Sequence, residues 1–212
     1  KNLIPYGERS GFALYHGTEI AALSDRVNAS EIGFVQQNPD NQIVTDYVWH
    51  ELAFGLENMA LPVPDIRRRV SEMASFFGME EWFHKKTCQL SGGQKQMLNL
   101  AAVMAMDPKL LILDEPTNGL DPSGIHEIRN LIKALPALYD CTVLISSHML
   151  SEIELIADDI GILNHGRLLF EGELDELRHY ALQHGFSADH LEDMFLSMIE
   201  QDNLSRKQRA KL

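Results

Sequence analysis

At residues 110–117 the chain reads Leu110-Leu111-Ile112-Leu113-Asp114-Glu115-Pro116-Thr117. A short apolar run without polar alternation is typical of a strand that is buried on both faces of a parallel sheet. Open sheets of this kind bind ligands at the carboxyl ends of their strands. The stretch therefore predicts an α/β protein in which Asp114 and Glu115 stand at the ligand-binding edge of the sheet.

Outward from this strand, short apolar segments alternate with segments of helical periodicity. Further strands are expected at 12–17, 32–36, 142–146, 160–163 and 167–170. Helices are expected at 92–106, at about 123–135 and at about 149–157. The alternation predicts a mainly parallel sheet that is flanked by helices on both faces.

Two helical regions lie outside this alternation. The first, at about 45–105, is predicted to be a helical subdomain, in which the pattern from Asp46 to about Phe77 is interrupted at residues 61–64 by two prolines. The second is a helical tail over about 173–212, which is amphipathic from Glu173 to Ile199. Its apolar residues at helical spacing, expected to pack on the body or on a dimer mate, are Leu191, Met194, Phe195 and Met198. Its basic end consists of Arg206, Lys207, Arg209 and Lys211.

The composition limits the classes of function. The chain has 212 residues with 31 acidic against 18 basic side chains, a net charge of -13, so no nucleic acid partner is expected. Its two cysteines, Cys88 and Cys141, fit neither a disulfide framework nor a zinc motif, which favours a reduced, cytoplasmic setting. No apolar run approaches the ~20 residues of a membrane-spanning helix, so any membrane crossing is expected from another chain.

Leu90-Ser91-Gly92-Gly93-Gln94 stands at the start of the helix expected from residue 92. A serine hydroxyl and glycine N–H groups at the positive end of a helix can bind an anion such as a phosphate. The same residues also suit an ordinary serine N-cap followed by a tight turn. Taken alone, the motif leaves these two interpretations open.

Polar side chains follow three of the expected strands. After residues 110–113, Asp114 could hold Mg²⁺ through water while Glu115 polarises an attacking water, although a solvated acidic turn is the simpler alternative. His148 follows the strand at 142–146 and could contact a γ-phosphate, whereas a lone histidine here is more often structural. Gln37 follows the strand that ends at Val35, and its amide could reach both metal and water.

The order and spacing of these elements resemble the ABC ATPase family from its Q-loop to its C-terminal end. The matching motifs are Val35-Gln36-Gln37-Asn38-Pro39, Leu90-Ser91-Gly92-Gly93-Gln94, Ile112-Leu113-Asp114-Glu115-Pro116-Thr117, Asn118-Gly119-Leu120-Asp121 and Ser147-His148. The resemblance implies that Gln37 is the Q-loop glutamine, which contacts metal and water, and that residues 91–94 form the signature loop. It further implies that Asp114 is the Walker B aspartate at the metal, Glu115 the catalytic base, Asp121 the D-loop aspartate and His148 the switch histidine.

The resemblance also implies ligands and partners. Members of the family bind ATP with Mg²⁺ between two nucleotide-binding domains that close head to tail, so the signature loop of one domain completes the site of the other. The expected function is that of the ATP-hydrolysing subunit of an ABC transporter, working with separate transmembrane subunits at the cytoplasmic face of the membrane. The residues from Tyr47 to Met59 are expected to dock a helix of such a subunit.

The first half of the chain looks like the ATPase subunits of energy-coupling factor importers. Asn38-Pro39-Asp40-Asn41-Gln42, Phe54-Gly55-Leu56-Glu57-Asn58 and the run from Gly93 to Ala101 carry this likeness. From Asn118 onward the sequence looks more like peptide-antibiotic resistance exporters. The direction of transport and the cargo therefore stay open.

One family motif is absent. A P-loop of the form G-x-x-x-x-G-K-[ST] should precede the Q-loop, but no Lys-Ser or Lys-Thr pair follows Gly7, Gly11 or Gly17. We expect that the chain is truncated upstream of Lys1, lacking the first strand and the P-loop, and that it is weak or inactive by itself. The alternatives are a catalytically silent or regulatory ABC-like domain and an ABC ATPase that acts outside transport.

Overall fold

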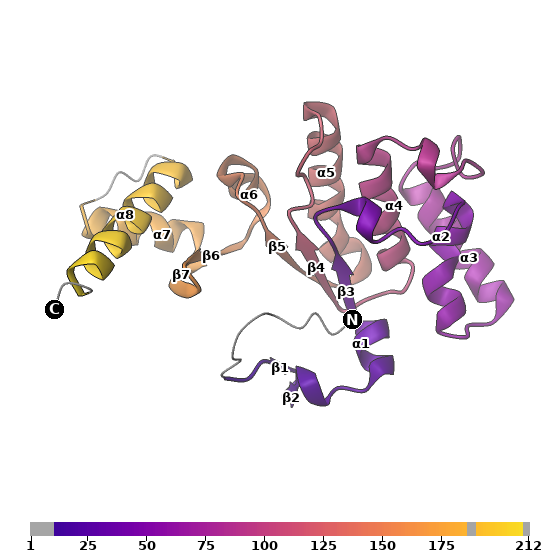
Figure 1. Ribbon diagram of the computed structural model, residues 1–212, viewed down its shortest axis with the longest axis horizontal. Helices are drawn as coiled ribbons and strands as arrows, with labels where there is room; N and C mark the ends of the chain where they lie inside the picture. Colours follow the sequence, from indigo (N-terminus) through magenta and orange to yellow (C-terminus); the bar gives the residue numbers. More distant parts are fainter. Residues whose placement is uncertain (1–10, 186–189, 210–212) are drawn as a thin grey trace. The chain divides into compact units, whose positions relative to one another are not determined.

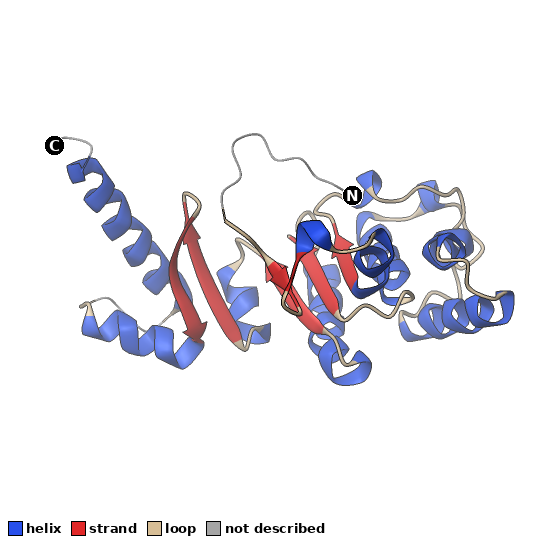
Figure 2. Ribbon diagram, turned by 90° about the horizontal axis from the view of Figure 1, so that it is seen from below, coloured by secondary structure: helices blue, strands red, loops and turns tan. Residues whose placement is uncertain are grey.

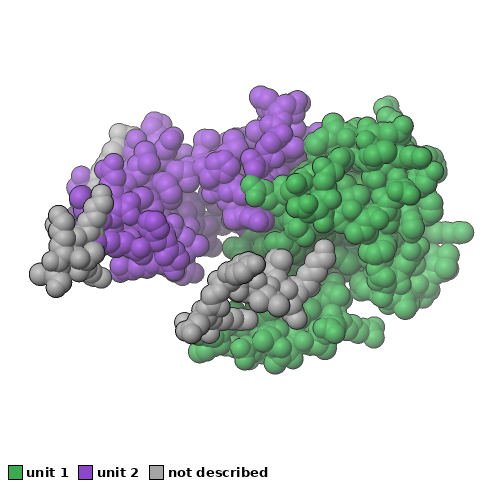
Figure 3. Space-filling model, in the orientation of Figure 1, with its two compact units in different colours: residues 1–113, 139–144 green, residues 114–138, 145–212 purple. Residues whose placement is uncertain are grey.

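The computed structural model describes residues 11–185 and 190–209 and divides the chain into two compact units (Figure 3). Unit 1 contains residues 1–113 and 139–144, and unit 2 contains residues 114–138 and 145–212. Each unit is described by itself below. Gly7, Lys1 and Lys211, which entered the sequence argument, lie outside the described residues.

The sheet has the strand order β3-β4-β5 (Figure 1). β3 (Ile32–Val35) runs parallel to β4 (Leu110–Asp114), and β5 is Thr142–Ser146. The register pairs Gly33 with Leu111 and Val35 with Leu113, so these residues share one face of the sheet. The predicted α/β class with a parallel sheet is confirmed.

Burial is uneven over this sheet. Val35, Leu111 and Leu113 are at most 1% exposed, whereas Leu110 and Ile112 are only partly buried, so one face of β4 is more fully buried than the other. On β5 every second residue is exposed, and Leu144 keeps 58% of its surface in contact with solvent. The helices therefore cover the β3–β4 face much more completely than they cover β5.

Helix α4 (Gly92–Met104) packs closely on β3. A Cβ atom added at Gly33 would collide with Val103 Cγ1 of α4 and would lie 3.2 Å from Leu111 Cδ1. Glycine at this position therefore sets how closely the helix approaches the sheet.

The predicted helical subdomain contains α2 (Val48–Asn58), α3 (Val63–Phe76) and α4, with a short 3-10 turn η3 (Thr87–Gln89) before α4. The break predicted at residues 61–64 falls between α2 and α3, where proline fits the first turn because no intrahelical N–H bond is lost there. The buried side chains of these helices include Leu52, Leu56, Val70, Met73, Met97 and Leu100.

The amino-terminal part of unit 1 differs from the prediction of one strand at 12–17. It forms a minimal hairpin of β1 (Leu14–Tyr15) and β2 (Thr18–Glu19), followed by the 3-10 turn η1 (Ile20–Ala22) and by α1 (Asp25–Glu31). His16 and Gly17 in the turn have φ values of 47° and 77°. The pair of positive φ angles is typical of a two-residue hairpin turn, which reverses the chain inside the predicted strand.

Unit 2 contains α5 (Pro122–Tyr139, whose last residue falls in unit 1), α6 (Leu150–Ile156), and the antiparallel hairpin of β6 (Asp159–Asn164) and β7 (Arg167–Glu173). Helix α5 continues four residues past its predicted end, through Pro136. The buried residues Ile128, Ile132 and Leu135 form the apolar stripe of α5. The hairpin turn consists of His165 and Gly166, both with positive φ.

The predicted helical tail contains α7 (Leu174–Gln183) and α8 (Leu191–Arg209), which are drawn in blue in Figure 2. α7 ends before Gly185, whose φ of 75° suits a helix C-terminus. Leu191, Met194 and Met198 are buried in a cluster with Ile160, Ile162, Leu177 and Ala181, and Phe195 packs against it. These residues of α8 thus pack within unit 2, against β6 and α7.

The described part of the basic end is tied to this cluster. Asp202 is only 8% exposed, accepts a hydrogen bond from Asn164 at 2.9 Å, and pairs with Arg206 at 3.1 Å. Within residues 11–185 and 190–209, no helix combines the length and the hydrophobicity needed to cross a bilayer.

Candidate functional site

The two acidic residues after the buried strand meet the end of β5. Ser146 Oγ donates a hydrogen bond to Asp114 Oδ1 at 2.7 Å. The Glu115 N–H donates to the Ser146 carbonyl at 3.1 Å and lies 3.2 Å from Ser146 Oγ. The carboxyl ends of β4 and β5 therefore lie side by side, as the sequence predicts for neighbouring strands of a parallel sheet.

Glu115 and His148 are in direct contact. Glu115 Oε2 lies 2.7 Å from His148 Nδ1 and also accepts a hydrogen bond from the His148 N–H at 3.3 Å. The Glu115 side chain is 19% exposed, whereas the His148 side chain is 65% exposed. A carboxylate that is half enclosed and held at one oxygen by an imidazole is suited to accept a proton from water.

The backbone of Glu115 is unusual. Its φ is 47°, in the left-handed region that non-glycine residues seldom adopt. Such a conformation costs of order 1 kcal/mol or more and persists where surrounding contacts fix it. Here the contacts of the Glu115 N–H with Ser146 and of its carboxylate with His148 provide that constraint.

Asp121 lies farther along the same unit, just before α5. Its Oδ1 accepts a hydrogen bond from the Gly124 N–H at 3.0 Å, which caps the amino end of α5. Gly119 in the preceding turn has a φ of 74°. Asp121 is exposed, and the structure gives it a capping contact rather than a contact with Asp114, Glu115 or His148.

An ion pair that sequence reasoning missed supports this part of unit 2. Arg129 of α5 and Glu152 of α6 are 2.8 Å apart, with side chains 19% and 16% exposed. α6 directly follows the segment that carries His148, so the pair anchors that segment to α5. The sequence spacing of 23 residues gives no signal for such a contact.

The predicted signature residues form a helix cap in unit 1. Ser91 Oγ accepts from the Gln94 N–H at 3.2 Å, and Gln94 Oε1 accepts from the Ser91 N–H at 3.0 Å. A Cβ added at Gly92 would meet no atom within 4 Å. The serine N-cap that the sequence allowed is therefore present, as part of a reciprocal cap with Gln94. Ser91 and Gly92 at this helix start are exposed.

Gln37 also lies in unit 1, on the segment after β3. It is exposed, and its side chain forms no hydrogen bond with any residue in the described part of the chain. The backbone around it is held by Gln42, whose side chain bonds to residues 34 and 36. Of the predicted site residues, the structure thus brings Asp114, Glu115 and His148 together in unit 2 and places Gln37 and residues 91–94 in unit 1.

The oxygen atoms beside Asp114 fit a magnesium ion that is also bound to phosphate. Mg²⁺ prefers oxygen ligands, keeps several waters, and is usually bound by one or two carboxylates together with phosphate oxygens. Asp114 supplies one carboxylate beside the Ser146 hydroxyl. Over residues 11–185 and 190–209, no three His, Cys, Asp or Glu side chains converge as a metal cage would require. The residues therefore fit a phosphate-bound Mg²⁺ and do not form a closed metal centre.

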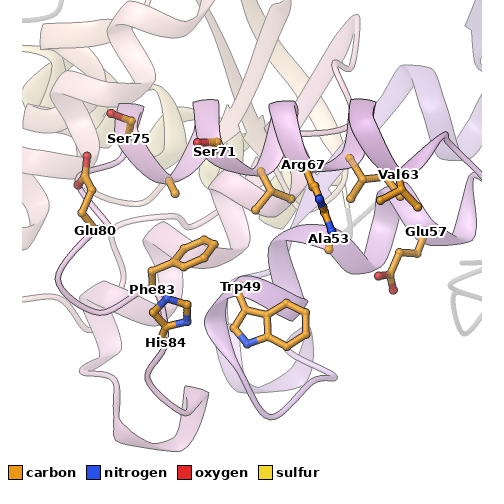
Figure 4. A pocket seen from close by; sticks show the side chains of 13 residues that line it. Trp49, Ala53, Glu57, Val63, Arg67, Ser71, Ser75, Glu80, Phe83 and His84 are labelled. Carbon is orange, nitrogen blue, oxygen red and sulfur yellow. The ribbon is translucent and has the colours of Figure 1, made fainter.

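A groove of about 820 Å³ lies in the helical part of unit 1 (Figure 4). Residues of α3 line one side, and Trp49 of α2 faces them together with Phe83 and His84. The apolar lining consists of Trp49, Ala53, Val63, Ile66, Val70, Ala74 and Phe83. Trp49 is 41% exposed and Val63 is 60% exposed, so the groove presents apolar surface to solvent.

The two cysteines are free, as expected from their spacing. Cys88 is exposed and Cys141 is buried. Burial raises the pKa of the Cys141 thiol above its ordinary value, since a thiolate loses hydration there.

Comparisons with known proteins agree with the predicted family. A family model described as "ABC transporter" matches residues 4–118, and one described as "AAA domain, putative AbiEii toxin, Type IV TA system" matches residues 88–154. A putative ABC transporter ATP-binding protein of Bacillus anthracis is 45% identical over 172 residues, which are 81% of this chain and 31% of the relative. The chain thus spans about a third of the length of that relative.

Two further relatives are matched by this chain over a larger share of their length. The energy-coupling factor transporter ATP-binding protein EcfA2 of Clostridium acetobutylicum is 34% identical over 206 residues, 95% of this chain and 70% of the relative. The solved structure of cbiO1 from Clostridium perfringens, described as part of the ABC transporter complex cbiONQ, has a TM-score of 0.72 and 35% identity. The matched region is 82% of this chain and 73% of the cbiO1 chain. The predicted likeness to energy-coupling factor ATPases is confirmed, and the chain belongs to the ATP-binding proteins of the ABC transporter family.

Proposed function

We propose that this chain contributes the catalytic carboxylate, the switch histidine and the signature loop of the ATP-hydrolysing subunit of an ABC transporter. The observation that carries the proposal is the 2.7 Å contact of Glu115 with His148 beside Asp114. This arrangement places a proton acceptor, its positioning partner and a metal-binding oxygen at the ends of two adjacent strands.

Each residue has a defined part in the proposed reaction. Bound ATP would supply the γ-phosphoryl group, and Mg²⁺ would offset its charge. Glu115 accepts the proton of the attacking water at a carboxylate oxygen. His148 fixes the orientation of that carboxylate through Nδ1 and, being 65% exposed, is free to turn toward a phosphate oxygen. Asp114 offers the ligand oxygen for the ion, and we assign the exposed amide of Gln37 to the same ion and water.

A second nucleotide-binding domain is part of the proposal. The start of α4, where Ser91 and Gly92 are exposed, can bind a phosphate of a nucleotide that another domain holds. Asp121, exposed at the start of α5, is assigned to the interface between the two domains. We retain residues 45–105 as the helical subdomain and 173–212 as the helical tail.

We further propose that the groove between α2 and α3 receives a helix of a transmembrane subunit. Its apolar lining and exposed rims at Trp49 and Val63 match the way in which an amphipathic helix binds a groove. This docking would place the chain at the cytoplasmic face of the membrane. A photoreactive group at position 49 in the assembled transporter should crosslink to a membrane subunit, and failure to label any membrane subunit would contradict the placement.

The substitution Glu115→Gln tests the catalytic assignment in the natural polypeptide that contains these residues. Glutamine keeps an oxygen that can accept the hydrogen bond from His148 but cannot take up a proton at neutral pH. Loss of a general base should lower kcat for ATP by about 10²-fold or more. The dissociation constant for ATP should stay unchanged.

The matched control is Glu127→Gln, because Glu127 is an exposed glutamate of α5 outside the site. This variant should hydrolyse ATP at the rate of the unaltered protein. Unchanged turnover in Glu115→Gln would remove Glu115 from the role of base.

A further inference from the structure

The segment that carries Gln37 is fastened to β3 by one side chain. This segment, residues 36–42, is called the Gln37 segment below. Gln42 Oε1 accepts a hydrogen bond from the Gln36 N–H at 2.9 Å, and Gln42 Nε2 donates to the Phe34 carbonyl at 3.0 Å. The Gln42 amide thus pairs with the backbone at the end of β3 as a neighbouring strand would. These two bonds close the Gln37 segment into a loop.

The middle of the same segment is fastened to α4. Asn99 Nδ2 donates a hydrogen bond to the Pro39 carbonyl at 3.1 Å. Lys95 Nζ lies 2.6 Å from Asp40 Oδ1, with the Lys95 side chain 19% exposed and the Asp40 side chain 65% exposed. Lys95 and Asn99 are four residues apart, so they share one face of α4.

The first turn of α4 is the predicted signature loop. The Lys95 N–H donates to the Ser91 carbonyl at 2.9 Å, so Lys95 lies one helical turn from Ser91. The cap at Ser91 and the two anchors on the Gln37 segment are therefore rigidly connected through the helix. Any displacement of the start of α4 along its axis moves the points at which Pro39 and Asp40 are held.

Asn99 is expected to lower the stability of the fold if its role is only structural. It is 1% exposed, and its Oδ1 has no hydrogen-bond partner among the described residues. A buried, unsatisfied amide oxygen destabilises a fold, whereas an apolar side chain of similar size would not. Among the described residues, the one hydrogen bond of the Asn99 side chain is the bond to the Gln37 segment.

We propose that Lys95 and Asn99 are positioning residues for Gln37: they couple the orientation of the Gln37 amide to the position of the signature loop at the start of α4. The inference rests on the proposed function, which makes Gln37 a ligand of the ion and the water. Binding of a phosphate at the start of α4 then acts on Gln37 through Lys95–Asp40 and Asn99–Pro39.

The first test is hydrogen exchange at the Gln36 amide in the variant Lys95→Met. Methionine keeps an apolar side chain but removes the ion pair with Asp40. Exchange at Gln36 should become about threefold to tenfold faster, because breaking one partly buried ion pair frees the Gln37 segment to open locally. Lys109→Met is the control, since it breaks the exposed Lys109–Asp140 pair in the same unit, and it should leave Gln36 exchange unchanged.

The second test separates positioning from a structural role by kinetics in the natural polypeptide. Lys95→Met and Asn99→Ala should each lower kcat for ATP by about threefold to tenfold with an unchanged KM, since a misplaced Gln37 affects the transition state more than ATP binding. The exchanged pair Asp40→Lys with Lys95→Asp should restore kcat to near the original value. Trp49 and Trp82 both lie in unit 1, so their fluorescence checks that each variant is folded.

Three results would overturn the proposal. One is unchanged Gln36 exchange in Lys95→Met, another is faster exchange without any loss of kcat, and the third is a loss of kcat that the exchanged pair does not restore. The proposed function has a separate test, since full turnover in Glu115→Gln would contradict it. In that case the exchange rate of the Gln36 amide still tests whether Lys95 of α4 holds the Gln37 segment.

Discussion

At the scale of single residues, Glu115 combines a left-handed backbone with a carboxylate held by His148. The two features support one another: the contacts with Ser146 and His148 stabilise the φ of 47°, and that φ turns the carboxylate toward His148. The contact itself was predictable, because residues after neighbouring parallel strands meet at one sheet edge. The backbone conformation was not, since nothing in the residue types around Glu115 marks a left-handed position.

The cysteines give a prediction about pH and reactivity. Thiolates react with iodoacetamide and thiols do not, so the buried Cys141, with its raised pKa, should resist alkylation while the exposed Cys88 reacts. At pH 8 the folded chain should therefore take up one label and the unfolded chain two. Mass spectrometry of the labelled chain measures this directly, and Cys88→Ser should abolish labelling of the folded form.

The same shift sets the sign of a pH dependence. The Cys141 pKa is raised in the folded state, so its contribution to the free energy of unfolding is fully present below the ordinary thiol pKa of about 8.5 and is lost as pH rises through the folded pKa. Cys141→Ala should remove this part of the decline above about pH 8. Identical pH profiles for the two proteins would show that Cys141 does not contribute.

At the scale of elements, the sequence predicted the strands and most helices because their apolar periodicity is strong. The hairpin of β1 and β2 was missed because residues 12–15 continue an apolar run into the turn at His16 and Gly17. The extension of α5 through Pro136 was missed because the apolar stripe ends at Leu135. Contacts such as Asn99 with Pro39 span 60 residues and depend on how helices approach the loop, which periodicity does not encode.

The approach of α4 to β3 yields a stability prediction. Gly33→Ala should lower the free energy of unfolding of unit 1 by about 1–3 kcal/mol, because the new Cβ collides with Val103. Urea denaturation followed by tryptophan fluorescence reports on unit 1, which contains both tryptophans.

Two further variants control this measurement. Gly161→Ala makes the same change in β6, where the nearest atom would be Leu168 Cδ1 at 3.7 Å, and it should have no effect on the fluorescence transition. Adding Val103→Ala to Gly33→Ala should recover part of the lost stability by removing the colliding methyl group. A double variant that is as unstable as the sum of both single variants would contradict the close-approach explanation.

At the scale of the whole molecule, the residues predicted for the site belong to two different units, each described by itself. Glu115, His148 and Asp114 belong to unit 2, whereas Gln37 and the start of α4 belong to unit 1. The sequence order of the motifs was sufficient to assign the family. The groove between α2 and α3 and the anchoring of the Gln37 segment required the structure, because both depend on side chains that meet only after the helices have packed.

The central claim is that these residues are part of an ATP-hydrolysing site that needs a P-loop, a motif which the 212 residues do not contain. The most direct test is Mg-ATP hydrolysis by the 212-residue chain, measured beside the natural polypeptide in which these residues occur. We predict turnover in the natural polypeptide and none above background in the 212-residue chain. Absence of turnover in both proteins would contradict the account and favour a silent or regulatory ABC-like domain.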